Sequence, residues 1–238
     1  MYNPRGLGWS TTDPEVTTHY ARSWGEEAVS WGPQIANMYK IWFDRSDSWH
    51  SLIDNVHQQV GMQWFQSSGA FINTDMMTAG RGGMTAGETR AELALYAALG
   101  APMLLCCDLR HLAHDNVTLA LVTNAELIAA NQDADCTMGT RLSPTSRRVA
   151  DERWAGELWI RPLSDGSFLV ALVNADPLQP RTLSVAWSGE GDLFPAGPFT
   201  KARVRDIFAR VDLGEFTDSW SAQIPPHDAR LLRLYLSA

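Results

Sequence analysis

Residues 85–107 read TAGETRAELALYAALGAPMLLCC, and this stretch decides the fold class. Thr85 and Glu88 have the spacing of a capping box, which predicts the start of a helix. Gly100 is expected to end that helix. The next segment, Pro102 to Cys107, is entirely apolar, as is typical of a strand buried on both faces of a parallel sheet. A helix that leads directly into such a strand predicts a β/α crossover architecture.

The residues before and after this stretch alternate between strands and helices in the same way. Apolar residues recur at helical spacing after Ser46, Asp47 or Ser48, any one of which can cap the helix; they are Leu52, Ile53, Val56 and Val60. The expected strands are Thr17–Ala21, Asn37–Phe43 and Gly69–Ile72, and the further expected helices are Trp49–Phe65 and Val117–Ala130. This order predicts a parallel sheet with helices in its connections.

The chain changes character after Gln132, where short strands and turns replace the helices. Leu163–Gly166 is expected to form a hairpin turn, and Pro225–Asp228 a turn before the last strand. The expected strands are Leu158–Ile160, Phe168–Val173, Thr182–Trp187, Ala202–Phe208, Phe216–Ile224 and Arg230–Leu236. Several short strands at this spacing predict an antiparallel sandwich.

Composition excludes several classes of protein. The chain has 238 residues, 45% of them hydrophobic, so it can form one large domain or two modest ones with a real core. The net charge is −8 and the longest basic cluster is Arg147-Arg148, so we expect no nucleic-acid partner. No apolar run reaches the ~18–20 residues that cross a bilayer, so we expect no membrane partner. Histidine and cysteine spacings fit no metal site, and we expect neither metal nor cofactor. The first residues show no secretory signal, and the compartment stays undetermined.

Polar residues follow three of the expected strands, at the edge where parallel β/α sheets collect functional groups. They are Asp44, Asp75 and the loop 22–27. The chain has 10 tryptophans, and some lie beside these residues, so a sugar-sized pocket is one interpretation. Each residue also has a purely structural interpretation. Asp44 can be a solvated loop acid or part of a helix cap, Asp75 can cap a turn, and the loop glutamates can simply be solvated.

The same segments, in order, resemble glycoside hydrolase family 27, the α-galactosidases and α-N-acetylgalactosaminidases. Residues 37–49 resemble the family stretch Asn-x-Trp-Arg-x-x-x-Asp-Ile-x-x-Ser-Trp, and residues 71–76 resemble Trp-Asn-Asp-Pro-Asp-Met. Further matching segments are Ser23-Trp24-Gly25, Gly100–Arg110, Asn131-Gln132-Asp133, Trp159–Leu163, Val204-Arg205-Asp206 and Pro225-Pro226-His227. The resemblance runs from about residue 17 to the end of the sequence.

The resemblance implies the fold class α/β plus all-β. The family fold is a (β/α)₈ TIM barrel followed by an antiparallel β-sandwich, and this sequence resembles its carboxyl-terminal part, from the fifth barrel strand onward. Residues 1–134 are expected to form a partial TIM-barrel catalytic domain and residues 135–238 the C-terminal sandwich. Half a barrel has two unpaired sheet edges that another chain would have to cover, so a homodimer is among the expected arrangements.

The resemblance also implies a retaining glycosidase that acts on terminal α-linked galactose or N-acetylgalactosamine. Asp44 takes the place of the general acid/base, and partial burial beside Trp42 and Trp24 would help it to keep its proton. Lys40 replaces a sugar-binding arginine and therefore loses that residue's bidentate fork. Asp75, Met76, Ser23 and Trp24 are the other expected sugar-binding positions. Ser23 replaces a glutamate, and a small residue there favours an N-acetyl group.

The family nucleophile follows a lysine on the fourth barrel strand, and this sequence has no lysine before Lys40. The only earlier aspartate, Asp13, is followed by a proline and is expected to be a turn residue. Two hypotheses follow. The chain is a hydrolase whose sequence here is incomplete, or it is a catalytically inert remnant or carbohydrate-binding module. Under either hypothesis we expect the isolated chain to be inactive, because Asp44 alone offers only acid–base help. A third hypothesis is an interaction protein that binds its partner through the sandwich.

Overall fold

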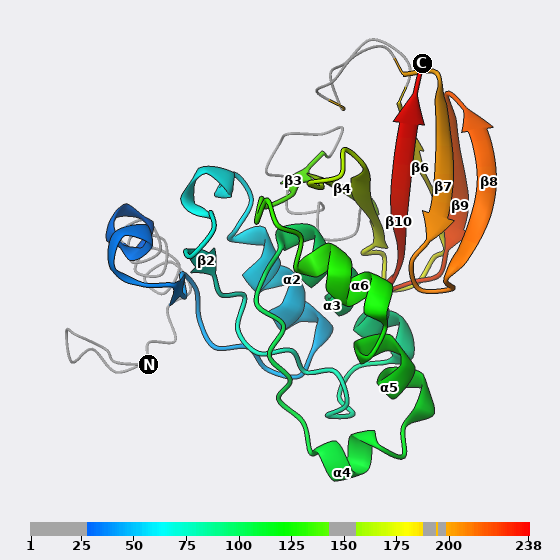
Figure 1. Ribbon diagram of the computed structural model, residues 1–238. Helices are drawn as coiled ribbons and strands as arrows, with labels where there is room; N and C mark the ends of the chain where they lie inside the picture. The colour runs from blue at the N-terminus through cyan, green and yellow to red at the C-terminus, as the bar shows by residue number, and fades with distance from the viewer. Residues whose placement is uncertain (1–27, 143–155, 188–193, 195–198) are drawn as a thin grey trace, which may run out of the picture.

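The computed structural model describes residues 28–142, 156–187, 194 and 199–238 (Figure 1). The expected strand Thr17–Ala21 and the expected site residues Ser23 and Trp24 lie outside the described residues. In the part described, helices and short parallel strands come first and antiparallel strands follow. No helix in this part is long and apolar enough to cross a membrane.

The helix predicted from the deciding stretch is α3, Ala86–Leu99. Thr85 and Glu88 form both hydrogen bonds of the capping box, and Gly100 ends the helix with a φ of 61°. Residues 91–99 are all buried because α3 is covered on every side in its second half. Its start and its end are as the sequence predicts.

The parallel sheet is shorter than predicted. Strands β1 (Met38–Tyr39) and β2 (Phe71–Ile72) pair in parallel, as expected, but each has two residues. The expected strand Pro102–Cys107 is wrong as a buried strand, because it forms one parallel bridge, Met77 to Leu105. Strands need ladder partners along their length, and among the described residues only those around Met77 supply them. Leu104 and Leu105 are consequently 41% and 37% exposed.

Two expected helices are interrupted. The helix expected at Trp49–Phe65 is α2 (Trp49–His57) followed by the 3₁₀ helix η1 (Gln63–Phe65), with Gly61 at a φ of 86° between them. The helix expected at Val117–Ala130 divides into α5 (Asn116–Val122) and α6 (Ala125–Asn131). The Asn124 side chain accepts hydrogen bonds from two backbone N–H groups at the start of α6, so this residue caps a new helix. Residues 28–35 are also helical, and a short helix, α4 (Leu109–Leu112), was not predicted.

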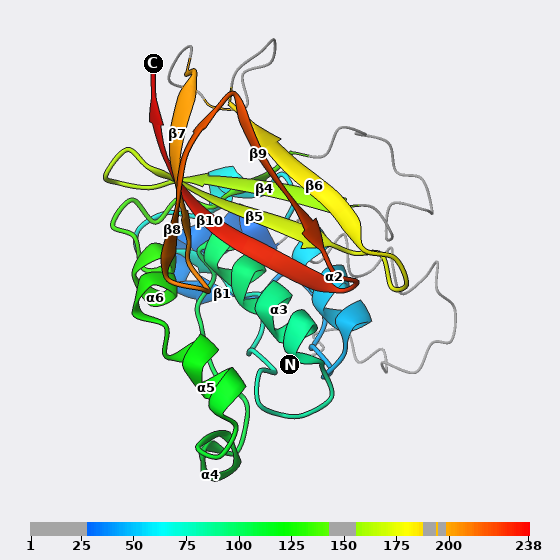
Figure 2. The same ribbon diagram turned by 90° about the vertical axis from the view of Figure 1, so that its right-hand side faces the viewer.

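The second half forms antiparallel sheets, consistent with a sandwich (Figure 2). One sheet has the order β3-β4-β5-β10-β7-β8 and the other pairs β6 with β9. The expected strand Phe216–Ile224 is wrong as one strand, because Asp218, at a φ of 64°, separates β8 from β9. The bounds are β3 Thr140–Arg141, β4 Gly156–Pro162, β5 Phe168–Asn174, β6 Arg181–Ala186, β7 Lys201–Asp206, β8 Val211–Thr217, β9 Ser219–Ile224 and β10 Asp228–Ser237.

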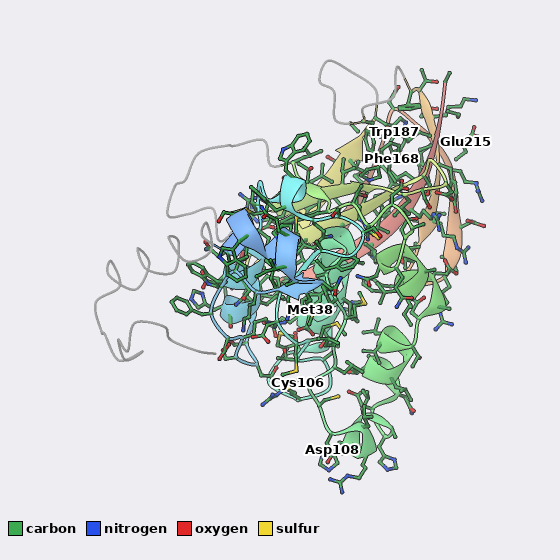
Figure 3. The ribbon with its side chains drawn as sticks, turned by 60° about the vertical axis from the view of Figure 1, so that its left-hand side comes forward. Met38, Cys106, Asp108, Phe168, Trp187 and Glu215 are labelled. Atoms are coloured by element: carbon green, nitrogen blue, oxygen red, sulfur yellow. The ribbon has the colours of Figure 1, made fainter. Side chains whose placement is uncertain are left out.

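Each face of the six-stranded sheet meets a different core. One face, which includes Phe168 of β5, packs against β6, β9 and Trp187, which follows β6. Glu215 of β8 lies at the exposed edge of this sheet (Figure 3). The other face packs against α3, which lies across β10, β5 and β4 (Figure 2). Trp159 and Leu231 of this face therefore share one hydrophobic core with the helices.

Polar contacts join the same two layers. Arg90 of α3 forms an ion pair with Asp228 of β10, with Nη2 and Oδ2 2.6 Å apart. His227 Nδ1 lies 2.9 Å from Glu88 Oε1, and the His227 ring stacks on Trp49 of α2. These contacts join α2 and α3 to the start of β10.

Candidate functional site

Three of the residues predicted for the site lie together after the ends of β1 and β2. Lys40, which directly follows β1, places its Nζ 2.6 Å from Asp44 Oδ1 and 2.6 Å from Asp75 Oδ2. Asp44 lies four residues after Lys40 in the sequence and Asp75 lies 35 residues after it. The Lys40 ammonium group contacts both carboxylates. Parallel strands bring their carboxyl ends to one edge, which is why residues so placed meet.

Asp75 is the anchored member of this group. Its Oδ2 accepts hydrogen bonds from Lys40 Nζ and the Arg45 backbone N–H, and its Oδ1 accepts one from the Met76 N–H. Burial works to raise the pKa of Asp75, but the Lys40 hydrogen bond and the two backbone N–H groups outweigh it and lower the pKa. Its φ is 76°, a left-handed backbone that is rare for aspartate. Asp75 is therefore a fixed anion.

Asp44 is the exposed member. Its side chain is 73% exposed, so the expectation of partial burial beside Trp42 is wrong. Trp42 is buried and turns its ring nitrogen to Asp54 Oδ2 at 2.7 Å, on α2. Asp44 instead contacts Lys40 through Oδ1. Its Oδ2 has no hydrogen-bond partner among the described residues, so it can bind a ligand or water.

Met76 follows Asp75 and is 43% exposed, so its side chain lies at the surface next to the anchored carboxylate. Whether Met76 contacts a sugar stays a prediction, as do the same roles of Lys40 and Asp75. The predicted roles of Ser23 and Trp24 fall on residues outside the described ranges.

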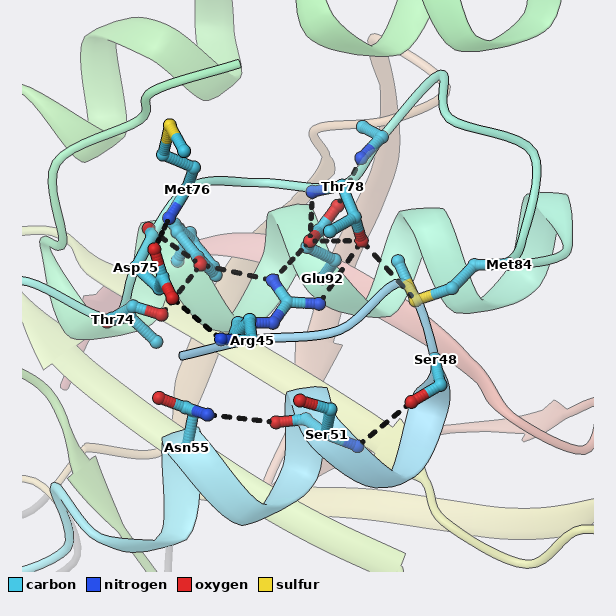
Figure 4. Close-up of polar contacts among 12 residues, drawn as sticks. Arg45, Ser48, Ser51, Asn55, Thr74, Asp75, Met76, Thr78, Met84 and Glu92 are labelled. Carbon is cyan, nitrogen blue, oxygen red and sulfur yellow. Dashed lines mark hydrogen bonds and ion pairs between the residues drawn. The ribbon is translucent and has the colours of Figure 1, made fainter. Parts of the chain in front are cut away.

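A buried polar network supports this group from below, and the sequence analysis missed it (Figure 4). The Arg45 guanidinium pairs with Glu92 of α3, and both side chains are almost fully buried, at 1% and 0% exposure. Arg45 Nη1 also donates to the Tyr96 hydroxyl at 3.1 Å, and that hydroxyl donates to the carbonyl oxygens of Thr74 and Asp75. The available signal was Glu92 itself, a carboxylate at a position surrounded by apolar helix residues.

The chemistry open to this arrangement is that of carboxylates and an ammonium group. Asp44 can accept or donate a proton at the surface, while Lys40, which also binds Asp75, contacts the Asp44 carboxylate. Among the described residues no three histidine, cysteine or acidic side chains are grouped so that they could hold a metal ion.

Two models of one family match the chain. The model described as "Alpha galactosidase A" matches residues 18–133, and the model described as "Alpha galactosidase C-terminal beta sandwich domain" matches residues 154–234. Together they account for most of the sequence, in the order of the two halves described above.

The chain belongs to glycoside hydrolase family 27 and matches the C-terminal part of the family's proteins.

Curated proteins named as α-galactosidases agree with this assignment. The chain is 31% identical over 214 residues to "Probable alpha-galactosidase" of Dictyostelium discoideum, and the match covers 89% of this chain and 52% of that protein. It is 30% identical to an α-galactosidase of Cyamopsis tetragonoloba, with 87% of this chain and 47% of that protein covered. The chain thus spans about half the length of the curated relatives it matches.

The fold is similar to that of α-galactosidase I from Mortierella vinacea. The TM-score is 0.75 at 24% identity, over 90% of this chain and 57% of the other. A family 27 β-L-arabinopyranosidase from Geobacillus stearothermophilus has a TM-score of 0.73 at 22% identity, over 88% of this chain and 47% of that one. These likenesses support the sandwich and the order of the layers.

Proposed function

We propose that this chain supplies the general acid/base, Asp44, of an α-galactosidase-like retaining glycoside hydrolase. The observation that carries the proposal is the contact of Lys40 with both Asp44 and Asp75 at the carboxyl ends of β1 and β2. In this proposal β1, β2 and the bridge at Leu105 belong to the sixth, seventh and eighth strands of a (β/α)₈ barrel. Residues 1–134 are then part of a catalytic barrel, and residues 135–238 are the sandwich.

The proposed reaction needs two carboxyl groups. A nucleophilic carboxylate attacks the anomeric carbon while protonated Asp44 gives its proton to the departing glycosidic oxygen. In the second step the Asp44 carboxylate takes a proton from water, the water oxygen bonds to the anomeric carbon, and the nucleophile is released. No lysine–aspartate pair of the kind that carries the nucleophile precedes Lys40 in this sequence. The nucleophile is therefore proposed to come from outside these 238 residues.

The proposed substrate is a terminal α-linked galactoside or N-acetylgalactosaminide. Relatives with 28–31% identity bear the name α-galactosidase, which favours galactose. The predicted place of Ser23 beside the 2-position favours the N-acetyl sugar. Assays on both sugars therefore belong to the test, and the −8 net charge argues against nucleic acid as a further partner.

A second candidate is a catalytically inert or carbohydrate-binding protein. The 73% exposure of the Asp44 side chain favours this candidate, because a general acid normally needs a site shielded from water to keep its proton near pH 7.

We also propose that the chain self-associates as a homodimer, because Leu104 and Leu105 leave an apolar edge exposed.

The test is complementation. The chain is produced together with the part of the Mortierella vinacea enzyme that precedes its matched region, and hydrolysis of p-nitrophenyl α-galactoside and its N-acetylgalactosamine analogue is measured. We expect turnover only with both halves, and a loss on the order of 10²–10⁴ in Asp44→Asn. Asp212→Asn, on β8 in the sandwich, is the matched control and should keep full turnover.

The other outcomes separate the candidates. Turnover that survives Asp44→Asn would sink the acid/base assignment. A purified complex of the two halves without any turnover would support the inert candidate. The chain by itself should be inactive, and turnover by it that Asp44→Asn abolishes would show that a nucleophile is present after all.

A further inference from the structure

Arg45 follows Asp44 directly, and its backbone and its side chain bind different parts of the molecule. Its backbone N–H donates to Asp75 Oδ2 at 2.7 Å. Its side chain points into the interior, where the guanidinium pairs with Glu92 of α3. The chain cannot therefore shift at residue 45 without breaking a buried contact, and the position of Asp44 depends on that residue.

Glu92 and Tyr96, four residues apart on α3, hold the second segment of the site in the same way. Glu92 Oε1 and Oε2 accept hydrogen bonds from the backbone N–H groups of Thr78 and Ala79, at 2.8 and 2.9 Å. The Tyr96 hydroxyl donates to the carbonyl oxygens of Thr74 and Asp75, both at 3.0 Å. Residues on one helix therefore bind both the Asp44–Arg45 segment and the Thr74–Ala79 segment (Figure 4).

Stability alone is a poor reason for this pair. Charges removed from water lose their solvation, and an apolar pair of the same volume is often as stable or more stable. Arg45 Nε is buried without a hydrogen-bond partner among the described residues, so the pair is not fully compensated. What an apolar pair cannot supply is direction, because the guanidinium and carboxylate bind only in fixed orientations. The resemblance does not supply the pair either, since the family stretch has isoleucine where this chain has Arg45.

We propose that Arg45 and Glu92 are positioning residues that set Asp44 against Asp75 through a buried ion pair on α3. The catalytic meaning of this role rests on the proposed function of Asp44. The positioning itself does not, and it can be measured in the 238-residue chain without any hydrolysis.

The measurement is a pH titration of the Asp75 carboxyl by NMR, read at its side-chain carbon and at the amides of Arg45 and Met76 that bond to it. The variant is Arg45→Met/Glu92→Gln, which removes both charges together. If the pair sets the position, Asp75 loses the Arg45 N–H, and its proton affinity rises on the order of tenfold. If the pair only stabilises the fold, the folded variant keeps the wild-type titration.

The matched control is Arg90→Met/Asp228→Asn, which removes another ion pair of α3, one that joins β10 and touches neither site segment. It should lower stability and leave the Asp75 titration unchanged. Tyr96→Phe is a second variant for the case that Arg45→Met/Glu92→Gln does not fold, because it deletes only the hydroxyl between Arg45 and Asp75. It should also raise the proton affinity of Asp75, by a smaller factor.

An Asp75 titration that is unchanged in the folded variants, or that changes equally in the control, would overturn the proposal. In the complemented enzyme the same variants should lower kcat on the order of 10- to 100-fold with little change in KM, because a displaced acid weakens the chemical step more than binding. A shifted titration together with an inactive complex would leave the positioning in place and reject the proposed hydrolase function.

Discussion

Lys40 Nζ lies 2.6 Å from Asp75 Oδ2, so an ammonium group after β1 meets a carboxylate after β2. Their side chains are 18% and 17% exposed, and the exposed Asp44 carboxylate lies on the same ammonium group. The contact brings together two segments that α2, η1 and β2 separate in the sequence. The Asp75 carboxylate is held by three hydrogen bonds, so its titration reports on the position of the residues around it.

Lys40→Met should make the stability of the chain less dependent on pH. Burial raises the pKa of Asp75, but Lys40 is the chief cause that lowers it in the folded chain. The Asp75 carboxylate therefore contributes to the free energy of unfolding above its unfolded pKa of about 4. That contribution is lost as the pH falls through the folded pKa. Urea unfolding should therefore show a gap between wild type and Lys40→Met at pH 7 that narrows at pH 3. Lys201→Met, whose side chain is 50% exposed, is the control, and an equal gap at both pH values would contradict the prediction.

Glu157→Gln should be strongly destabilising at neutral pH. Glu157 is 2% exposed, lies 2.6 Å from His57 Nε2, and accepts a hydrogen bond from Trp159. Burial raises its pKa, but the His57 contact and the Arg141 charge outweigh this and lower it. We expect a loss of about 3 kcal/mol at pH 7, since the amide removes the buried negative charge that the Arg141 guanidinium meets at 3.7 Å.

Acid should also remove the difference in stability between wild type and Glu157→Gln. A glutamate whose pKa is lowered in the folded chain stabilises the fold only above its unfolded pKa of about 4.3. Thermal unfolding of both proteins at pH 7 and pH 3 gives the comparison. Glu215→Gln, on β8 with a side chain 62% exposed, should change stability by less than about 0.5 kcal/mol. A loss at Glu157 as small as that would show that the buried contact is not formed.

Thr85→Ala should destabilise the chain by about 1 kcal/mol, with no dependence on pH near neutrality. The Thr85 hydroxyl accepts a hydrogen bond from the Glu88 N–H at 3.2 Å, and the Thr85 N–H donates to Glu88 Oε2 at 2.8 Å. Chemical denaturation gives the value. Thr85→Ser keeps the capping oxygen and should restore most of the loss, whereas equal effects of alanine and serine would rule out the cap as the cause.

Leu105→Lys should reduce self-association. Leu104 and Leu105 are exposed beside a single bridge, and a lysine on an exposed edge opposes the addition of another strand. Sedimentation at micromolar concentration should find dimers or larger species for the wild type and fewer for the variant. Leu178→Lys, at a leucine 77% exposed in the sandwich, is the matched control. A wild type that is monomeric throughout would reject the homodimer.

Much of the fold follows from local pattern. α3 begins and ends where its capping box and Gly100 predict, because these signals act within one turn of the helix. The hairpin at Leu163–Gly166 and strand β5 were predicted on the same local basis. The expected strand at Pro102–Cys107 was wrong, because its composition indicates burial but its ladder depends on neighbours that no local pattern specifies.

The sequence by itself determined the family, the order of the layers and the choice of Asp44 and Asp75, since these polar residues follow expected strands, and the resemblance to the family added Lys40. Only the tertiary structure decided that Asp44 is exposed and that Arg45 and Glu92 pair beneath it. Burial and ion pairing between α3 and a loop forty-seven residues away depend on how the elements pack, and side-chain spacing along the chain does not encode that distance.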